Sequence, residues 1–336
     1  MTIGVQPGGA GITVLNGGAA TKSGGFLSGS AAKKLLVHGV DALRTNTTLL
    51  YDEWKLFDGV VTRVARERLV VVQELLRRGL TYPIPNALGV LQLVWQTSGD
   101  LEEAEVTMTG LPEADKDQLD FGLASMPIPM IHKEFTLDLR QLMVSRRGNM
   151  PLDTTMAEIA SRKVMEKIEQ IVFAGLNIAP NLGQVYGLLT HPYRNTGSVT
   201  AGWTTATGAQ IVTDIIAMMN EAIAANQFGP YVLFIPTAVF TRLTEDYKAE
   251  SDRSILDRIM QIPGLDAIIP TNRMTGNNVL MVQLTSDVIQ IIDGIRPTMV
   301  EWEERGGFEL NFMIFAIMLP RIRSDYANQS GIIHYS

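Results

Sequence analysis

One segment in the middle of the chain has the clearest helical pattern. Its apolar side chains recur at helical spacing and would lie along one stripe: Ile159, Ala160, Val164, Ile168, Ile171 and Val172. Thr155 and Glu158 match the capping box that starts many helices, and Gly175 matches the glycine that often ends them. The pattern therefore predicts one long amphipathic helix over 155–174.

Two further patterns precede this helix. Apolar residues at helical spacing predict a helix over 60–78 that ends at Gly79, although the β-branched run 70–72 leaves a strand as an alternative. Residues 88–97 and 119–125 have the composition of extended strands, and the polar stretch between them contains Gly99, Gly110 and Pro112. These two strands predict a long β-hairpin.

Three more extended segments lie outside the long helix, two before it and one near residue 310. The segment 126–131 contains two prolines, so it should be a stiff connector or an edge strand. Residues 135–140 alternate between apolar and polar side chains, as a half-buried strand does. Residues 308–319 are apolar on both faces, which predicts a central strand covered on both sides.

The part of the chain after a joint rich in Gly and Thr, 197–208, alternates between helical and extended patterns. Thr207 and Gln210 match a capping box and predict a helix that ends before Gly229. Further helices are predicted over 237–247 and 254–261, strands over 231–235, 267–269, 279–284 and 288–292, and a turn over 276–278. Together these elements predict a compact α/β unit.

Composition narrows the class of protein. The chain has 336 residues, no cysteine, 28 basic and 35 acidic residues, and a net charge of -7. A chain of this length can form a sizeable core. The absence of cysteine excludes disulfides, thiol catalysis and cysteine-ligated metals, and the negative net charge disfavours a large surface that binds DNA.

Nine of the 30 glycines lie in the first 30 residues, which predicts an arm that gains order only from a partner; the alternative is a merely frayed end. There is no signal peptide, and the longest apolar run, 312–319, is shorter than the roughly 18 residues of a membrane span.

Motifs for catalysis are missing from the sequence. The segment around Lys22 lacks the glycines of a phosphate-binding loop, and the G-x-S-x-G motif does not occur. The four histidines are far apart in sequence, at His38, His132, His191 and His334. Carboxylates cluster at two places, Glu102, Glu103 and Glu105, and Glu301, Glu303 and Glu304, where polar neighbours favour a solvated state. We therefore predict no catalytic, cofactor or metal site and a protein that is not an enzyme, with a soluble α/β enzyme using a carboxylate cluster as the remaining alternative.

The order of the elements resembles one family of shell proteins. The resemblance lies in MPIPMIHKEFTLDLRQL (126–142), PLDTTMAEIASRKVMEKIEQIVFAG (151–175) and YGLL (186–189), and then in FGPYVLFIPTAVFTRL (228–243) and WEERGGFELNFMIFAIMLPRIR (302–323). Together these segments resemble the tailed-phage major capsid proteins of the Hong Kong 97 type, whose fold is shared with the encapsulin nanocompartments. The resemblance extends from about residue 40 to the end of the chain.

The resemblance implies an α+β fold with a defined division. Residues 1–40 would be an N-terminal arm, 41–84 a joining segment, and 85–127 an extended loop formed by a β-hairpin. Residues 128–198 with 306–326 would form a peripheral domain around the long spine helix. Residues 199–305 would form an α/β axial domain, and 327–336 a C-terminal tail.

The resemblance also implies a function. The chain would be a major capsid protein that assembles with copies of itself, as hexamers and pentamers, into an icosahedral shell enclosing double-stranded DNA without reading its sequence. It would be assembled in the host cytoplasm and located in the virion, with portal, scaffold or decoration proteins as further partners and no membrane. An encapsulin shell around a cargo enzyme is the alternative, and the long glycine-rich arm favours the virus.

Contacts between subunits are expected in the acidic stretch and after the 135–140 strand. Between Gly99 and Asp120 there are eight acidic residues and a single lysine, and such a segment has little to pack against in its own domain. The expected contact residues are Glu102, Glu103, Glu105, Asp115, Lys116, Asp117, Arg146 and Arg147. Some shells of this type join a lysine of the loop to a neighbour's asparagine; Lys116 is the one candidate, but a solvated lysine is the simpler interpretation.

Overall fold

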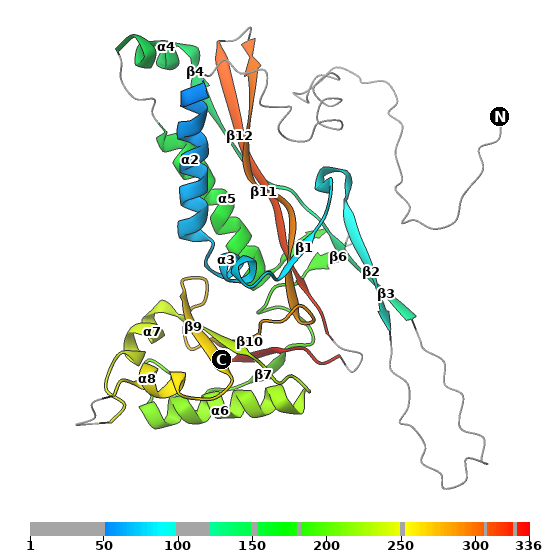
Figure 1. The fold of residues 1–336 in the computed structure, drawn as a ribbon, viewed down its shortest axis with the longest axis vertical. Coiled ribbons are helices and arrows are strands. Elements are labelled where there is room, and N and C mark those ends of the chain that lie inside the picture. Colours follow the sequence, from blue (N-terminus) through cyan, green and yellow to red (C-terminus); the bar gives the residue numbers. More distant parts are fainter. Residues whose placement is uncertain are drawn as a thin grey trace, which may run out of the picture. The chain divides into compact units, whose positions relative to one another are not determined.

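The structure is a computed structural model that describes residues 51–98, 121–148, 154–179, 183–248, 253–305, 308–324 and 328–336. The predicted N-terminal arm and residues 99–120 of the predicted hairpin lie outside these residues. Within them, the strands form a four-stranded sheet, a five-stranded sheet and two smaller pairs. Figure 1 shows the two larger sheets, each with helices beside it.

The four-stranded sheet is built around two long antiparallel strands. β11 (Ile289–Glu304) pairs with β12 (Glu309–Ile322), and β1 (Thr81–Pro83) and β4 (Ile131–Asp138) complete the order β1-β11-β12-β4. β12 is buried along nearly its whole length. The prediction of a central strand covered on both faces is confirmed from residue 309 onward, whereas Phe308 is exposed and outside the strand, which continues to residue 322.

β11 is much longer than the strand predicted over 288–292. The sequence after 293 contains Gly294 and Pro297, which usually end a strand. In the structure the register with β12 shifts between Asp293 and Ile295 and again between Ile295 and Thr298. Both residues therefore lie at β-bulges, where no regular ladder hydrogen bond is needed, and the strand passes through them.

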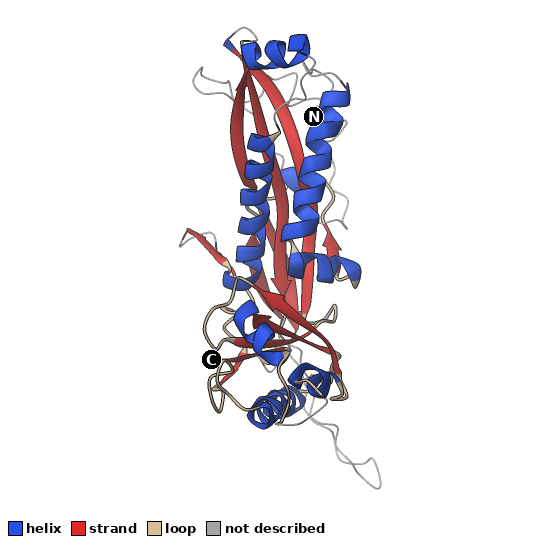
Figure 2. Ribbon diagram, turned by 90° about the vertical axis from the view of Figure 1, so that its left-hand side faces the viewer, coloured by secondary structure: helices blue, strands red, loops and turns tan. Residues whose placement is uncertain are grey.

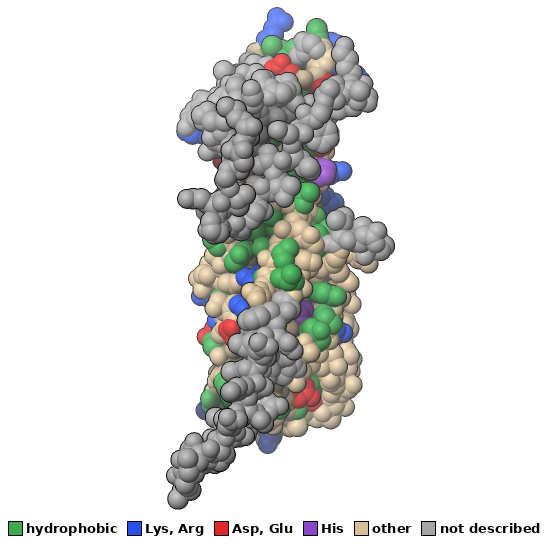
Figure 3. All heavy atoms as spheres, turned by 90° about the vertical axis from the view of Figure 1, so that its right-hand side faces the viewer, with side chains coloured by type: hydrophobic (Ala, Val, Ile, Leu, Met, Phe, Trp, Pro, Cys, Tyr) green, Lys and Arg blue, Asp and Glu red, His purple; other side chains and the backbone are tan. Residues whose placement is uncertain are grey.

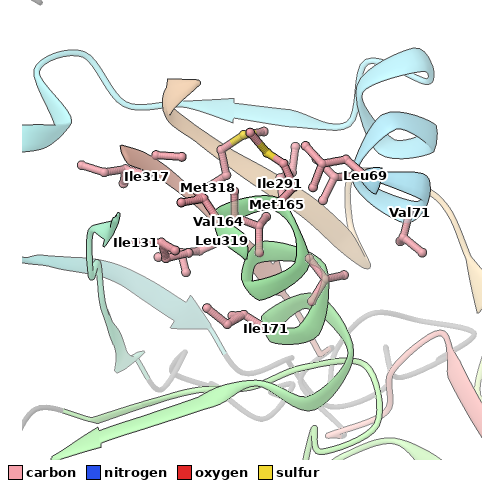
Figure 4. Packing of buried hydrophobic residues seen from close by; sticks show 14 of the residues in the cluster. Leu69, Val71, Ile131, Val164, Met165, Ile171, Ile291, Ile317, Met318 and Leu319 are labelled. Atoms are coloured by element: carbon pink, nitrogen blue, oxygen red, sulfur yellow. The ribbon is translucent and has the colours of Figure 1, made fainter. Parts of the chain in front are cut away.

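Helices α2 (Tyr51–Arg68) and α5 (Thr155–Ala174) cover one face of this sheet (Figure 2). Phe57 of α2 stacks on Phe312 of β12 with ring centroids 5.5 Å apart, and Phe312 stacks on Phe135 of β4 at 5.0 Å. Figure 4 shows Val164 and Met165 of α5 packed near β11 and β12 residues of the core. Burying these side chains contributes about 1.5–3 kcal/mol each, so the helix pair is the main cover of this sheet.

The helix predicted over 60–78 is present but divided in two. α2 ends at Arg68, and α3 (Val70–Arg77) follows after Leu69, whose side chain is buried. The alternative strand over 70–72 is wrong. α3 buries Val71, Val72 and Leu75, and burial of this apolar side outweighs the β-propensity of three valines.

The start of α5 differs from the predicted capping box. The N-cap residue is Thr154, and no side chain caps the helix there. Glu158 instead forms an ion pair with Arg63 of α2 at 3.5 Å. The expected role of Thr155 is therefore wrong by one residue, and the carboxylate joins two helices rather than closing a box.

The end of α5 explains the Gly-Leu-Leu segment physically. Gly175 ends the helix with φ 71° and ψ -171°, and β5 (Leu176–Ala179) and β6 (Gly183–Val185) return the chain to the helix end. The N–H groups of Leu188 and Leu189 then donate to the carbonyls of Val172 and Phe173, at 2.9 and 2.8 Å. Carbonyls in the last turn of a helix have no partner within the helix, so residues 187–189 act as a backbone cap.

The predicted hairpin consists of β2 (Gln92–Ser98) and β3 (Phe121–Pro127), paired antiparallel from Gln92 with Pro127 to Ser98 with Phe121. The first predicted arm begins later than expected, because residues 87–89 form a short 3-10 turn, η2 (Ala87–Gly89). Residues 128–130 then connect β3 to β4, so the predicted connector over 126–131 is shorter than expected: Met126 and Pro127 belong to β3, and Ile131 begins β4.

The five-stranded sheet has the order β7-β13-β10-β8-β9. Its strands are β7 (Asn195–Gly197), β8 (Tyr231–Pro236), β9 (Leu265–Thr271), β10 (Val279–Gln283) and β13 (Ile332–Tyr335), and its helices are α6 (Gly208–Ala224), α7 (Thr237–Leu243) and α8 (Ile255–Met260). The capping box of Thr207 and Gln210 is confirmed. The sequence pattern did not predict β13, which lies between β7 and β10 within the segment expected to be a tail.

Candidate assembly surfaces

The described histidines and acidic residues do not converge. Among these residues, no group of three or more His, Asp or Glu side chains could hold a metal ion. His191 is buried between the rings of Tyr186 and Tyr193, and burial lowers its pKa to about 4. His334 contacts the amide oxygen of Asn278 at 3.0 Å, and burial lowers its pKa as well. Both imidazoles are therefore neutral packing groups at neutral pH.

The second carboxylate cluster is split between two environments. Glu301 is buried, whereas Glu303 and Glu304 are exposed at the end of β11. Glu304 accepts a hydrogen bond from the indole N–H of Trp302 at 3.2 Å. The expectation that this cluster is solvated is thus wrong for Glu301.

No helix in the described ranges is long and apolar enough to cross a membrane.

The base of the hairpin is joined to the four-stranded sheet by a stack of three side chains. The guanidinium carbon of Arg321 in β12 lies 4.5 Å from the ring centroid of Tyr82 in β1 and 5.3 Å from that of Trp95 in β2. Arg321 is 8% exposed and donates to the side-chain oxygen of Gln290 at 3.1 Å. Burial, together with the charge of Arg323, lowers its pKa. The rings take the place that a carboxylate usually has beside a buried arginine.

The hairpin exposes apolar side chains rather than burying them. Leu91 is 83% exposed and Leu123 is 81% exposed, and Val94 is exposed between them in the strand pair. The space-filling view shows hydrophobic side chains on the face from which β2 and β3 leave the sheet (Figure 3). An exposed apolar surface on a two-stranded pair marks an interaction site, because such a pair is marginal without cover.

A basic helix lies at the end of β4. α4 (Leu139–Gly148) buries Leu142 but exposes Met143, Val144 and Arg147. The helix contains three arginines and no acidic residue. Arg146 lies in α4, but its side chain is outside the described residues, as are Glu102, Glu103, Glu105, Asp115, Lys116 and Asp117. The structure therefore places one predicted contact residue, Arg147, on the surface and leaves the others as predictions.

The outer face of α6 carries no charged side chain. Its exposed positions include Thr213, Ile216, Asn220 and Ile223, spaced three or four residues apart. The two acidic residues of α6 are held inside: Asp214 accepts from Trp203 Nε1 at 2.9 Å, and Glu221 accepts from the hydroxyl of Tyr335 at 2.7 Å. A surface helix of a monomer usually shows charge on this face, so the face fits contact with another protein.

α3 is held at its start by a side chain from α5. Leu69, the N-cap residue of α3, gives no side-chain cap, and Oε1 of Glu169 accepts from the N–H of Val71 at 2.8 Å. Glu169 is 2% exposed, and burial raises its pKa to about 7, against the opposing effect of the N–H groups of Val70, Val71 and Val72 and the charge of Arg273. A carboxylate at a helix N-terminus is stabilised by the free N–H groups, so Glu169 caps α3 from 98 residues away.

Sequence reasoning did not find Arg321, Trp95 or Glu169. Each stands in a segment whose pattern was used only to predict an element. One signal was available: Glu169 and Arg321 interrupt apolar runs that form the core faces of their elements, and a buried charge there needs a partner. Their partners come from distant parts of the chain, which no local pattern identifies.

Comparisons with known proteins give a family, a relative in sequence and two similar folds. A family model described as "Family of unknown function (DUF6260)" matches residues 42–335. The type 1 encapsulin shell protein EncA of Myxococcus xanthus is 27% identical over 232 residues, which cover 69% of this chain and 75% of that protein. A virus-like particle from Pyrococcus furiosus is 17% identical with a TM-score of 0.61, over 85% of this chain and 99% of that chain. The capsid of Myoviridae phage XM1 is 14% identical with a TM-score of 0.58, over 77% of this chain and 90% of that chain.

These likenesses confirm the expected fold class. The described residues combine helices and sheets in the α+β arrangement of the Hong Kong 97-type capsid fold. The resemblance to this superfamily, which includes phage capsid proteins and encapsulins, is confirmed as well.

Proposed function

Because the chain belongs to the DUF6260 family and has the Hong Kong 97-type fold, we propose that it is a structural, non-catalytic protein whose copies assemble into a closed shell. The observation that carries the proposal is the exposed hairpin. β2 and β3 form a separate two-stranded sheet, and Leu123 of β3 and Leu91, directly before β2, are almost completely exposed. A second copy of the chain is the partner that would cover them, through contacts between unlike surfaces that close into rings.

The two sheets supply the two domains of such a subunit. We assign β1, β4, β11 and β12 with α2, α3 and α5 to the peripheral domain, and the five-stranded sheet with α6, α7 and α8 to the axial domain. This assignment moves 289–304 to the peripheral domain and 332–335 to the axial domain, because hydrogen bonds join β11 to β12 and β13 to β10. The uncharged face of α6 would then meet neighbouring axial domains around the symmetry axes.

Of the two kinds of shell, we propose the major capsid protein of a tailed bacteriophage, enclosing double-stranded DNA. The likeness to phage XM1 supports the fold, and the 50 residues before α2, rich in glycine at their start, provide an arm for contacts between subunits. The net charge of -7 fits a container that must not bind its contents tightly. The protein would then reside in the virion, with portal, scaffold or decoration proteins as further partners.

An encapsulin shell around a cargo enzyme is the second candidate, and a specific observation favours it. The curated relative with 27% identity is named as an encapsulin shell protein. The genes that neighbour the gene of this chain would separate the two candidates. Portal, terminase and protease genes support the capsid, whereas a peroxidase or ferritin-like gene supports the compartment.

Electron microscopy of the purified full-length chain tests the proposal. Closed particles of uniform diameter are the expected result. The mass of the particles is measured on the same sample. Nuclease-resistant DNA inside particles from infected or induced cells supports the phage capsid, and co-purified enzyme supports the compartment. A monomer that persists under all assembly conditions contradicts both.

Neutralising the acidic hairpin segment is expected to weaken assembly. We propose that residues 99–120 of one copy lie near the basic helix α4 of another, because the first segment has eight acidic residues and the second three arginines. In the triple variant Glu102→Gln, Glu103→Gln, Glu105→Gln, the loss of three proposed charge contacts at about 0.5 kcal/mol each should raise the protein concentration needed for assembly about tenfold. Sedimentation velocity at several protein and salt concentrations measures this.

The matched control removes the same charge elsewhere. Glu134→Gln, Asp287→Asn and Glu303→Gln change three exposed acidic residues outside the hairpin. This control should assemble like the wild type, and Arg147→Gln should show part of the defect. Equal effects of both triple variants would mean that only total charge matters, and the proposed contact would be wrong.

A further inference from the structure

The hairpin is attached to the rest of the chain by packing: Met126 and Leu93 contact the core, β3 lies against β6, and Trp95 joins the three-residue stack. β2 and β3 hydrogen-bond only to each other in their two-stranded sheet. Toward the four-stranded sheet, the Trp95 ring faces the guanidinium of Arg321, and the Tyr82 ring lies on the same guanidinium. The stack joins β2 to both β1 and β12, so it bears on the direction of the hairpin relative to the four-stranded sheet.

Arg321 is held in place from within its own sheet. It lies directly opposite Gln290 in the β11–β12 register, and it donates to the side-chain oxygen of that residue at 3.1 Å. Among the described residues it forms no salt bridge, and its Nε has no hydrogen-bond partner. The guanidinium thus contacts two aromatic rings rather than a carboxylate.

A neighbouring close contact fixes the turn that leads into the hairpin. A Cβ on Gly294, at the first bulge of β11, would meet the Cβ of Ala87 in η2 at 2.7 Å. The missing side chain lets η2 lie directly on β11, a few residues before Trp95. The turn η2 and the three-residue stack therefore restrain the hairpin at two points.

We infer that Arg321 is the positioning residue of the hairpin, setting its direction by holding the Trp95 and Tyr82 rings against one guanidinium. The planar contact keeps its attraction as long as each ring stays over the guanidinium face. Loss of the contact removes one of the packing interactions that support β2 and β3, and a two-stranded pair is marginally stable in water without such support. The consequence for a shell rests on the proposed function: hairpin direction would set how neighbouring copies meet, and hence particle diameter.

Hydrogen–deuterium exchange of the full-length chain tests the inference on the backbone amides of 92–98 and 121–127. Trp95→Leu keeps an apolar side chain but removes the ring face, and Arg321→Met keeps length but removes the charge. Both should speed exchange in the hairpin about tenfold, the loss expected for one desolvated cation–aromatic contact. The conservative variants Trp95→Phe and Tyr82→Phe keep a ring and should stay within about threefold of the wild type.

Exchange in β8 and β10 of the other sheet is the internal control and should not change. Faster exchange there as well would mean that Arg321 only supports the core, and the inference would be overturned. Unchanged hairpin exchange in Trp95→Leu, or equal effects of leucine and phenylalanine, would also overturn it. If Arg321→Met does not fold, the half-buried Trp95 and Tyr82 substitutions still decide the question.

Particle diameter separates this inference from the proposed function. Electron microscopy of Trp95→Leu should show mixed diameters where the wild type gives one. Faster hairpin exchange without any wild-type particles would support the role of Arg321 and contradict the shell. Uniform wild-type particles with unchanged exchange in the variants would support the shell and contradict the role of Arg321.

Discussion

Replacement of Gly187 by alanine is expected to lower the melting temperature by about 10 °C, because it removes the backbone cap of α5. A Cβ at residue 187 would lie closer than 3.0 Å to the backbone of Phe173 and Gly175. These are main-chain atoms, so no rotamer change can relieve the overlap. The chain would have to move away, and the hydrogen bonds from Leu188 and Leu189 to the last turn of α5 would be lost. We expect a cost of about 3–5 kcal/mol.

Gly175→Ala should have a similar effect for a second reason. Its φ of 71° with ψ of -171° lies in a region that residues with a side chain rarely adopt. The matched control is Gly59→Ala in α2, where nothing lies within 4 Å of an added Cβ. Alanine is the better helix former by about 0.5–1 kcal/mol, so this variant should melt slightly higher. Thermal unfolding followed by circular dichroism measures all three, and a Gly187→Ala protein that melts like the wild type would contradict the expectation.

The stability of the wild type relative to Glu169→Gln is expected to fall as the pH rises. Burial raises the pKa of Glu169 from its ordinary value of 4.5 to about 7 in the folded chain. The folded state therefore binds this proton more tightly than the unfolded state does. The stabilisation is fully present below about pH 4.5 and is lost as the pH rises to about 7, by an amount of about 3 kcal/mol. Glutamine keeps an oxygen that can accept from the Val71 N–H but does not titrate.

Denaturant unfolding at several values between about pH 4 and pH 8 measures this difference. The free energy of unfolding of the wild type minus that of Glu169→Gln should decline with rising pH through this range and then level off. Glu166→Gln, which removes a carboxylate one turn away on a less buried side of α5, should give no change of this size. Glu169→Ala should be destabilised at every pH, because it leaves the Val71 N–H at the start of α3 without its acceptor. A flat difference for Glu169→Gln would contradict the predicted titration.

The sequence was most informative where a local pattern coincided with burial. The stripe from Ile159 to Val172 predicts α5 because that stripe is the core face, and the doubly apolar run 308–319 predicts β12 because both of its faces are covered. The hairpin strands were predictable from their extended composition and the polar, Gly- and Pro-containing stretch between them. In each case periodicity reports the environment of the element directly.

The missed features depend on partners far away in sequence. β11 passes through Gly294 and Pro297 because β12 lies beside it for the whole length, and β13 is a strand because β7 and β10 leave a space between them. Arg321 and Glu169 are tolerated in the core because aromatic rings and a helix N-terminus arrive from other elements. The capping box at Thr155 fails for the opposite reason, since a matching local motif was not used.

The position of β13 has a consequence for the timing of synthesis. Residues 332–335 fill an inner place in the five-stranded sheet, and β12, ending at residue 322, fills an inner place in the four-stranded one. A nascent chain still held in the ribosome at these residues lacks an inner strand in each sheet. Neither sheet is complete until the residues of its inner strand have been synthesised, so we expect both sheets to close late in the synthesis of residues 1–336.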